Sequence, residues 1–199
     1  MTAARQPKPP RMTVDAFLDW AERQPGGRYE LVDGEVWAMA SETVLHVRVK
    51  SRAFAALDRA VEASGLPCEA LGDGATVRVA PETAYEPDAL LRCGPDLPDD
   101  GGLEVPDPLL VVEVLSPSSR AVDTGRKFAG YFALPSLRHY LILDPVARTV
   151  LHHRRDGEGG PISSALLRDA AEGPSLLLDP PGLLVPVAAL FGARRPTAP

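Results

Sequence analysis

Two carboxylates stand in apolar surroundings that suit the inside of a protein. Glu113 is the one charged residue in the run LLVVEVL at positions 109–115. Such a run predicts a strand covered on both faces, where a carboxylate without partners costs roughly several kcal/mol. Asp88, 25 residues earlier in YEPDALL, belongs to a second strand candidate. We expect the two strands to be neighbours and the two carboxylates to lie within about 6 Å, sharing a cation such as Mg²⁺ or Mn²⁺.

Other interpretations of these residues remain open. A buried basic side chain could compensate Glu113, or water could reach it at the end of its strand. Asp88 follows Pro87, and Pro-Asp is common in turns. Lys127 shares a predicted helix face with Asp123 and Tyr131 at spacings of i, i+4 and i+8, and this face could point toward the strand ends. The alternative for Lys127 is an exposed ion pair with Asp123.

The composition indicates an ordinary globular protein of one domain. The chain has 199 residues, of which 45% are hydrophobic and 24% charged. We predict a mobile tail over residues 1–11, a domain over 12–191 and a second tail over 192–199. The chain has no run of about 20 apolar residues and no secretory leader pattern. Cys68 and Cys93 are too few and too isolated for a disulfide framework or a thiolate zinc site, which favours a reducing, cytoplasmic location.

The charge is unevenly distributed, although the formal net charge is only -6. Residues 61–115 hold 12 acidic and 2 basic side chains, whereas residues 116–155 hold 7 basic and 2 acidic ones. These segments could gather a divalent cation and a polyanion at neighbouring places if the fold brings them together. Two solvated surfaces of opposite sign explain the pattern equally well.

The predicted elements describe an α/β or α+β domain with a mixed central sheet. The sheet should be centred on the apolar strands at 109–115 and 140–143. The Asp33-Gly34 pair predicts a two-residue hairpin turn, because glycine accepts the positive φ that this turn needs. The other expected elements are a short helix capped by Thr13, a long helix at 41–64 ended by Gly65, strands at 76–80, 85–93, 109–116, 138–144, 148–155 and 176–178, and helices at 121–133 and 187–191.

Several segments together carry a resemblance to a known family. They are YELVDGE, PDALL, the long stretch PDPLLVVEVLSPSSRAVDTGRKFAGYFALPSLRHYLILDP, and RTV, in this order. Over roughly residues 12–191 the chain resembles the Uma-type putative restriction endonuclease family. That family is assigned to the PD-(D/E)XK nuclease superfamily, whose core is a mixed sheet flanked by helices. The resemblance implies a restriction-endonuclease-like fold and a Mg²⁺- or Mn²⁺-dependent endodeoxyribonuclease.

The resemblance also implies roles for individual residues. Asp88 corresponds to the aspartate of the PD element and Glu113 to the acid of the (D/E)XK element. These two, with the Val114 carbonyl, would hold the metal against a phosphodiester oxygen. The lysine of the (D/E)XK element should stand at position 115, which is leucine here. The Uma-type pattern places a lysine in the following helix, where Lys127 matches it and would orient the attacking water or stabilise developing charge.

The same resemblance adds weaker candidates. Glu30, in YELVDGE, would join the catalytic residues, and His46 matches a histidine that the family often carries, although a helix-surface histidine is equally expected. Tyr131 accompanies Lys127 on its helix. Arg120 and Arg126 would contact DNA phosphates, with DNA as the partner. Because nucleases that cut both strands are often dimers, a homodimer is expected by analogy.

Two other classes of function compete with an endonuclease. One is a nucleic-acid-binding or interaction module that keeps the nuclease fold without turnover. The other is a structural protein whose Glu113 pairs with a buried arginine. The deciding feature is whether Lys127 reaches the carboxylates. The serines at 116, 118 and 119 lack the G-x-S-x-G elbow of a nucleophile, and the sequence has no phosphate-binding glycine loop.

Overall fold

The computed structural model of the chain describes residues 11–24, 26–98, 102–116, 123–171 and 173–193. The predicted tails therefore fall almost entirely outside the described residues, and so does Arg120. The backbone of residues 123 and 124 is described, but their side chains are not.

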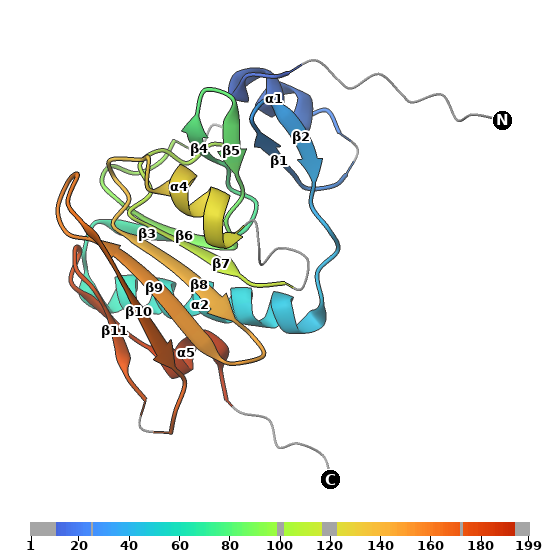
Figure 1. The fold of residues 1–199 in the computed structure, drawn as a ribbon. Coiled ribbons are helices and arrows are strands. Elements are labelled where there is room, and N and C mark those ends of the chain that lie inside the picture. Colours follow the sequence, from blue (N-terminus) through green and yellow to red (C-terminus); the bar gives the residue numbers. More distant parts are fainter. Residues whose placement is uncertain (1–10, 25, 99–101, 117–122, 172, 194–199) are drawn as a thin grey trace, which may run out of the picture.

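A six-stranded sheet forms the centre of the described structure (Figure 1). Its order is β10-β9-β8-β7-β6-β3. β7 and β8 run parallel, and the other neighbours are antiparallel. The predicted mixed sheet is thus confirmed, with the apolar run around Glu113 in its middle. The strands are β3 (Cys68–Gly72), β6 (Ala89–Cys93), β7 (Leu110–Val114), β8 (His139–Asp144), β9 (Thr149–Arg155) and β10 (Ile162–Arg168).

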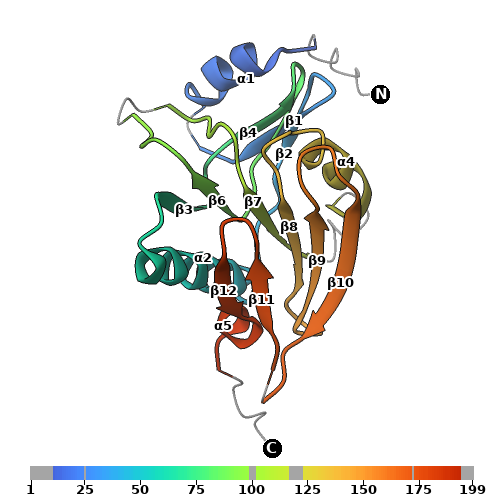
Figure 2. The same ribbon diagram turned by 90° about the vertical axis from the view of Figure 1, so that its left-hand side faces the viewer.

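Helices cover both faces of this sheet, which explains why β7 is apolar on both sides. The long helix α2 (Val44–Ser64) and the short α5 (Val187–Phe191) pack with Val112 and Val114 on one face. The helix α4 (Phe128–Tyr131) packs with Val111 on the other. Figure 2 shows α2 and α4 on opposite sides of the central strands.

A smaller antiparallel sheet carries the N-terminal hairpin. Its order is β2-β1-β5-β4, and α1 (Val14–Ala21) lies against it, capped by Thr13 as predicted. The turn between β1 and β2 places Asp33 at φ 50° and Gly34 at φ 77°. Both values are positive, as a primed two-residue turn requires. The strands are β1 (Tyr29–Val32), β2 (Glu35–Ala38), β4 (Val77–Ala80) and β5 (Thr83–Tyr85).

Some sequence predictions were wrong in detail. The segment 85–93 is not one strand, because β5 ends at Tyr85 in the small sheet and β6 begins at Ala89 in the central one. The strands β3, β10 and β12 (Leu183–Pro186) were missed, whereas β11 (Ser175–Leu178) was anticipated. The helix expected over 121–133 is a π-helix, Asp123–Lys127, followed by α4. The long helix begins at Val44 after its cap Thr43, and Gly65 ends it in the left-handed conformation as predicted.

The two cysteines were also misjudged. Cys68 opens β3 and Cys93 closes β6, and the register of these antiparallel strands pairs the two residues directly. Their sulfurs form a disulfide that joins the edge strand to its neighbour. A separation of 25 residues in the chain concealed this pairing, because it depends on β3, which was not predicted.

A buried histidine pair links the central sheet to the C-terminal hairpin. His139 Nε2 lies 2.8 Å from the Pro180 carbonyl oxygen, and His139 Nδ1 lies 2.9 Å from His152 Nε2. Since a carbonyl only accepts, His139 donates from Nε2 and accepts at Nδ1 from His152. Burial lowers the pKa of both imidazoles to about 4, and the positive charge of Arg154 acts in the same direction. Both rings are therefore neutral in the folded protein near neutral pH.

We expect this pair to make the fold sensitive to acid. In the unfolded chain both histidines have a pKa near 6.5. As the pH falls from 6.5 toward 4, the unfolded chain therefore binds protons at these two residues while the folded chain does not. The free energy of unfolding should fall by roughly 2–4 kcal/mol by pH 5 through this pair. Urea unfolding at pH 7 and pH 5 measures the fall. An equal fall in a His139→Gln/His152→Gln variant would show that other groups cause it.

Candidate active site

Glu113 is compensated by two donors from the helical segment that follows β7. Its side chain lies on the α4 face, and the residue is 5% exposed. Lys127 Nζ lies 2.9 Å from Glu113 Oε1, and the Tyr131 hydroxyl donates to the same oxygen at 2.7 Å. A buried carboxylate in an apolar strand thus receives a charged and a neutral hydrogen bond. Lys127, whose contact with the carboxylates was to distinguish a nuclease from a binding module, therefore reaches Glu113.

The close approach of α4 depends on a glycine. A Cβ at position 130 would lie 2.8 Å from Cε2 of Tyr85, so a larger residue would push the helix away. Tyr85 in turn packs edge-on against the Tyr131 ring, with centroids 5.3 Å apart. Burial, reinforced by the negative charges of Glu113 and Glu30, raises the pKa of Tyr131 well above its usual value. Its hydroxyl consequently stays protonated and keeps donating to Glu113.

A second carboxylate reaches Lys127 from the N-terminal hairpin. Glu30, on β1, places Oε1 2.9 Å from Lys127 Nζ. The same oxygen accepts the backbone N–H of Glu86 at 3.0 Å, which fixes the Glu30 side chain against the loop between β5 and β6. Lys127 is only 4% exposed, so its ammonium group is held between two carboxylates away from bulk water.

Asp88 lies next to Glu113 in the sheet, just before β6. Its backbone N–H donates to the Val112 carbonyl oxygen at 3.0 Å, and its Oδ2 accepts the Val114 N–H at 2.7 Å. Its other oxygen, Oδ1, lies 3.2 Å from His46 Nε2 on α2. Asp88 is 5% exposed and is not a solvent-facing turn residue. Asp88 therefore lies beside β7, one residue before β6 begins. Asp88 contacts His46 on α2, whereas Glu113 contacts Lys127 and Tyr131 on the α4 side, so the predicted sharing of a cation within about 6 Å stays a prediction.

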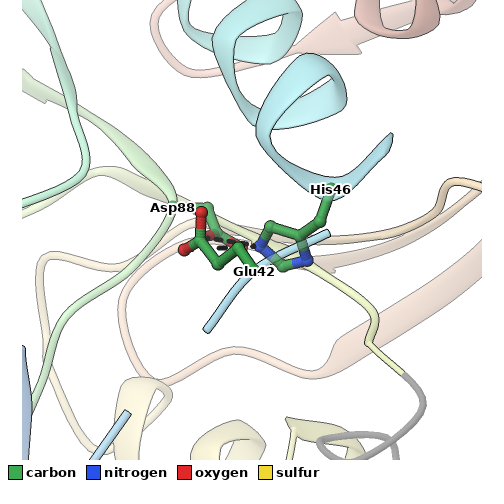
Figure 3. A group of neighbouring side chains, drawn as sticks. All are labelled: Glu42, His46 and Asp88. Carbon is green, nitrogen blue, oxygen red and sulfur yellow. Dashed lines mark hydrogen bonds and ion pairs between the residues drawn. The ribbon is translucent and has the colours of Figure 1, made fainter. Parts of the chain in front are cut away.

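The structure groups three potential metal ligands at this point (Figure 3). One ligand atom each from Glu42, His46 and Asp88 lies within 4.8 Å of the others. His46 lies in the first turn of α2, and Glu42 directly precedes the N-cap Thr43. The two residues are four apart, so their side chains lie on the same side of the helix N-terminus. No described residue is hydrogen-bonded to His46 Nδ1, so Nε2 is the nitrogen directed at the carboxylates.

Two cations hold the acidic groups around this cluster. Lys50 Nζ lies 2.6 Å from Oε1 of Glu42 and 2.6 Å from Oδ2 of Asp73. Arg28 Nη1 lies 2.6 Å from Glu42, and its Nε lies 2.6 Å from Glu86. Burial raises the pKa of the Glu86 carboxyl despite the opposing effect of Arg28.

These contacts join all the site residues into one network. Among the described residues it contains six carboxylates and three permanent cations. A group of carboxylates held close together offers the oxygen ligands that suit a divalent cation. The carboxylates are Glu30, Glu42, Asp73, Glu86, Asp88 and Glu113, and the cations are Arg28, Lys50 and Lys127.

A family model matches residues 14–187, which is most of the chain, and its description is Uma2, Putative restriction endonuclease. The chain belongs to the Uma2 family. Two similar proteins of uncharacterised function come from Synechocystis sp. strain PCC 6803. One, slr1290, is 31% identical over 154 residues, covering 74% of this chain and 76% of that one. The other, sll1609, is 26% identical over 163 residues, covering 81% and 90%.

A solved structure has the same fold. It is a protein from Anabaena variabilis described as a putative nuclease of the DUF820 group. The TM-score is 0.66 at 17% identity, and the match covers 90% of this chain and 97% of that one. The nuclease-like mixed fold predicted from the sequence is therefore confirmed. Within the described residues, no helix is long and apolar enough to cross a membrane.

The site residues that were predicted from the sequence form two groups in the structure. Lys127, Glu113 and Glu30 are in direct contact, with Tyr131 beside them, whereas His46 contacts Asp88. The Val114 N–H links the groups by donating to Asp88, and a metal-binding role for its carbonyl stays a prediction.

The predicted DNA-contacting arginines are less informative. Arg126 is exposed and lies 3.9 Å from Asp33, at the hairpin turn. Arg120 lies outside the described residues. Their contacts with DNA remain predictions.

Glu42 is a potential metal ligand that was not predicted from the sequence. It directly precedes the cap Thr43 and stands four residues before His46. That spacing was a usable signal, because it places a carboxylate and an imidazole on the same side of a helix start.

Proposed function

We propose that the protein is a Mg²⁺- or Mn²⁺-dependent DNA endonuclease that hydrolyses phosphodiester bonds. The proposal depends most on the buried ammonium group of Lys127, whose Nζ lies 2.9 Å from Oε1 of Glu113. Glu113 is on β7, and the backbone N–H of Asp88 is hydrogen-bonded to that strand. Leucine occupies position 115, where the nuclease pattern expects its lysine, and Lys127 supplies a cation to the same acid from the next helix. Membership in the Uma2 family supports the same assignment.

The donor atoms suit a hard divalent cation. Glu113 offers carboxylate oxygens from β7 and Asp88 offers them from the residue before β6, and Glu42 and His46 lie beside Asp88. Oxygen ligands suit Mg²⁺ and Mn²⁺, and the additional imidazole favours Mn²⁺ over Mg²⁺. When bound, the cation would act as a Lewis acid and lower the pKa of a coordinated water.

The protein's own residues would then position and stabilise the reacting groups. The Val114 N–H holds Asp88 through Oδ2, which leaves Oδ1 directed toward the His46 side. Tyr131 orients Glu113 by donating to Oε1. Lys127 would place its charge where negative charge develops on the phosphate oxygens, an interaction that is strong where water is excluded. Lys127 would also orient the attacking water.

The test is a plasmid-nicking assay with purified wild-type protein. We expect supercoiled DNA to become nicked or linear with Mg²⁺ or Mn²⁺, and to remain intact with EDTA. A preparation of an Asp88→Ala variant, purified identically, controls for contaminating nucleases. Wild-type inactivity on single-stranded, double-stranded and branched DNA with both metals would refute the proposal. Retained DNA binding in that case would favour the binding module instead.

A further inference from the structure

A second polar site lies at the same end of the central sheet as Glu113. It is an open cavity of about 890 Å³ between α2, α5, the β8–β9 turn and the end of β10. Four arginines line it, and Asp169 is the one carboxylate among the lining residues. We call it the arginine pocket, and the four are Arg52, Arg59, Arg148 and Arg168.

The arginine pocket is unusual within an acidic protein. Other arginines are neutralised by several acids, as with Arg28, which contacts three carboxylates, and Arg78, which contacts two. In the part of the chain that the structure describes, no ion pair is recorded for Arg52, Arg59 or Arg168, and all three are exposed. A cluster of unneutralised guanidinium groups creates a local positive potential despite the net charge of -6.

The fourth arginine is fixed in place. Arg148 Nε lies 2.6 Å from Asp169 Oδ2, and its Nη2 donates to the Gly192 carbonyl oxygen at 2.6 Å. Its guanidinium also lies over the Phe191 ring, 5.3 Å from the centroid. Arg148 has a φ of 51°, which a residue with a Cβ rarely adopts, so these contacts hold the backbone as well as the side chain. Alanine and glycine residues form much of the remaining lining and leave the cavity wide.

The pocket lies on the α2 and α5 side of the sheet, the side on which Asp88 contacts His46, whereas Glu113 faces α4. A polyanion that reaches both would pass around the end of the sheet where β7 and β8 finish. Val114 pairs with Leu143 near the ends of the parallel strands β7 and β8, and Arg148 follows β8 in the next turn. Arg168 ends β10 opposite Thr149. Three steps between neighbouring strands separate β7 from β10, or about 14 Å. A DNA duplex covers that distance in about four base pairs.

We propose that the arginine pocket binds backbone phosphates of the DNA outside the bond that is cut. This inference rests on the proposed function, whose DNA it would anchor. Guanidinium groups suit phosphate, because their planar donors match two oxygens at once. Phosphate contacts carry no base identity, so the binding should be independent of sequence and should weaken with salt.

The test separates binding from cleavage. Fluorescence anisotropy of a labelled DNA duplex, in EDTA and at a series of KCl concentrations, compares wild type with Arg52→Gln/Arg168→Gln. We expect roughly tenfold weaker binding and a salt slope smaller by about 1.8, for two lost phosphate contacts. The control Arg23→Gln/Arg154→Gln removes the same charge at positions that do not line the pocket. Arg52→Lys/Arg168→Lys should retain most of the affinity, and circular dichroism checks the fold of each variant.

The outcomes distinguish this inference from the proposed function. If wild type binds DNA but never cuts it, the endonuclease proposal is refuted. A loss of DNA binding confined to the pocket variant would in that case still support the pocket proposal. If wild type cuts and the pocket variant binds DNA as well as the control does, the pocket proposal is overturned while the endonuclease stands. Saturation by micromolar pyrophosphate without competition with DNA would assign the pocket to a small phosphorylated ligand and overturn the proposal.

Discussion

Replacing Lys127 by alanine is expected to lower DNA cleavage by about 10²-fold or more while metal binding stays largely intact. Lys127 Nζ contacts Glu113 and Glu30 but is not part of the Glu42, His46 and Asp88 group. Its removal therefore takes away positive charge near the reacting phosphate and leaves those ligand candidates in place. Rates under single-turnover conditions, with metal affinity from calorimetry, measure the two effects separately.

The Lys127 variant needs a check on folding, because its loss leaves two carboxylates without this cation. Breaking a buried ion pair destabilises proteins by about 3–5 kcal/mol. Lys127→Gln keeps a hydrogen-bond donor at the position, and it should fold if alanine does not. Arg23→Ala is the control, since it removes an exposed cation that is not among the predicted site residues. Undiminished cutting by both Lys127 variants would remove this lysine from the mechanism.

DNA binding separates a catalytic role from a binding role for Lys127. Because Lys127 is buried and held by two carboxylates, it should contribute little to non-specific attraction of DNA. Binding by the Lys127→Ala protein should therefore persist and should weaken with salt, as counterion release requires. A loss of binding as large as the loss of cleavage would identify Lys127 as a DNA contact.

The parts of the site that sequence analysis could reach are those with a strong local signal. Glu113 stood out because every other residue of its strand is apolar, and the structure provides the two donors that such burial requires. The Asp33-Gly34 turn was equally readable, because both residues take positive φ in a two-residue hairpin. Lys127 came from the family resemblance, since its helical spacing alone favoured a surface ion pair.

The parts that escaped depend on contacts between distant segments. Arg28 and Lys50 hold Glu42 across separations of 14 and 8 residues, and nothing in their own segments marks them as site residues. The strand β10 is largely exposed, so it shows no alternation of apolar and polar residues that would reveal it. The π-helix before α4 also shifts the spacing on which the Asp123, Lys127 and Tyr131 face was predicted.

Replacing Asp88 by alanine is expected to abolish both metal binding and cleavage. Asp88 is the residue that connects the two halves of the site, because Oδ2 is fixed by the β7 backbone and Oδ1 lies beside His46. Asp88→Asn tests the charge alone, since an amide oxygen can still accept the Val114 N–H while binding a cation more weakly. We expect Asp88→Asn to lower Mn²⁺ affinity and cleavage by about 10²-fold or more.

A matched control decides whether Asp88 is a ligand or only part of a negative field. Asp73→Asn removes one negative charge from the same network, but Asp73 contacts Lys50 and Arg28 and is not in the three-residue metal group. Its side chain is 38% exposed, so its field at the cluster is screened more strongly. Calorimetry with Mn²⁺ on both variants should find a large loss for Asp88→Asn and little for Asp73→Asn. Equal losses would mean that the cation responds to total charge, and unchanged affinity in Asp88→Ala would place the metal elsewhere.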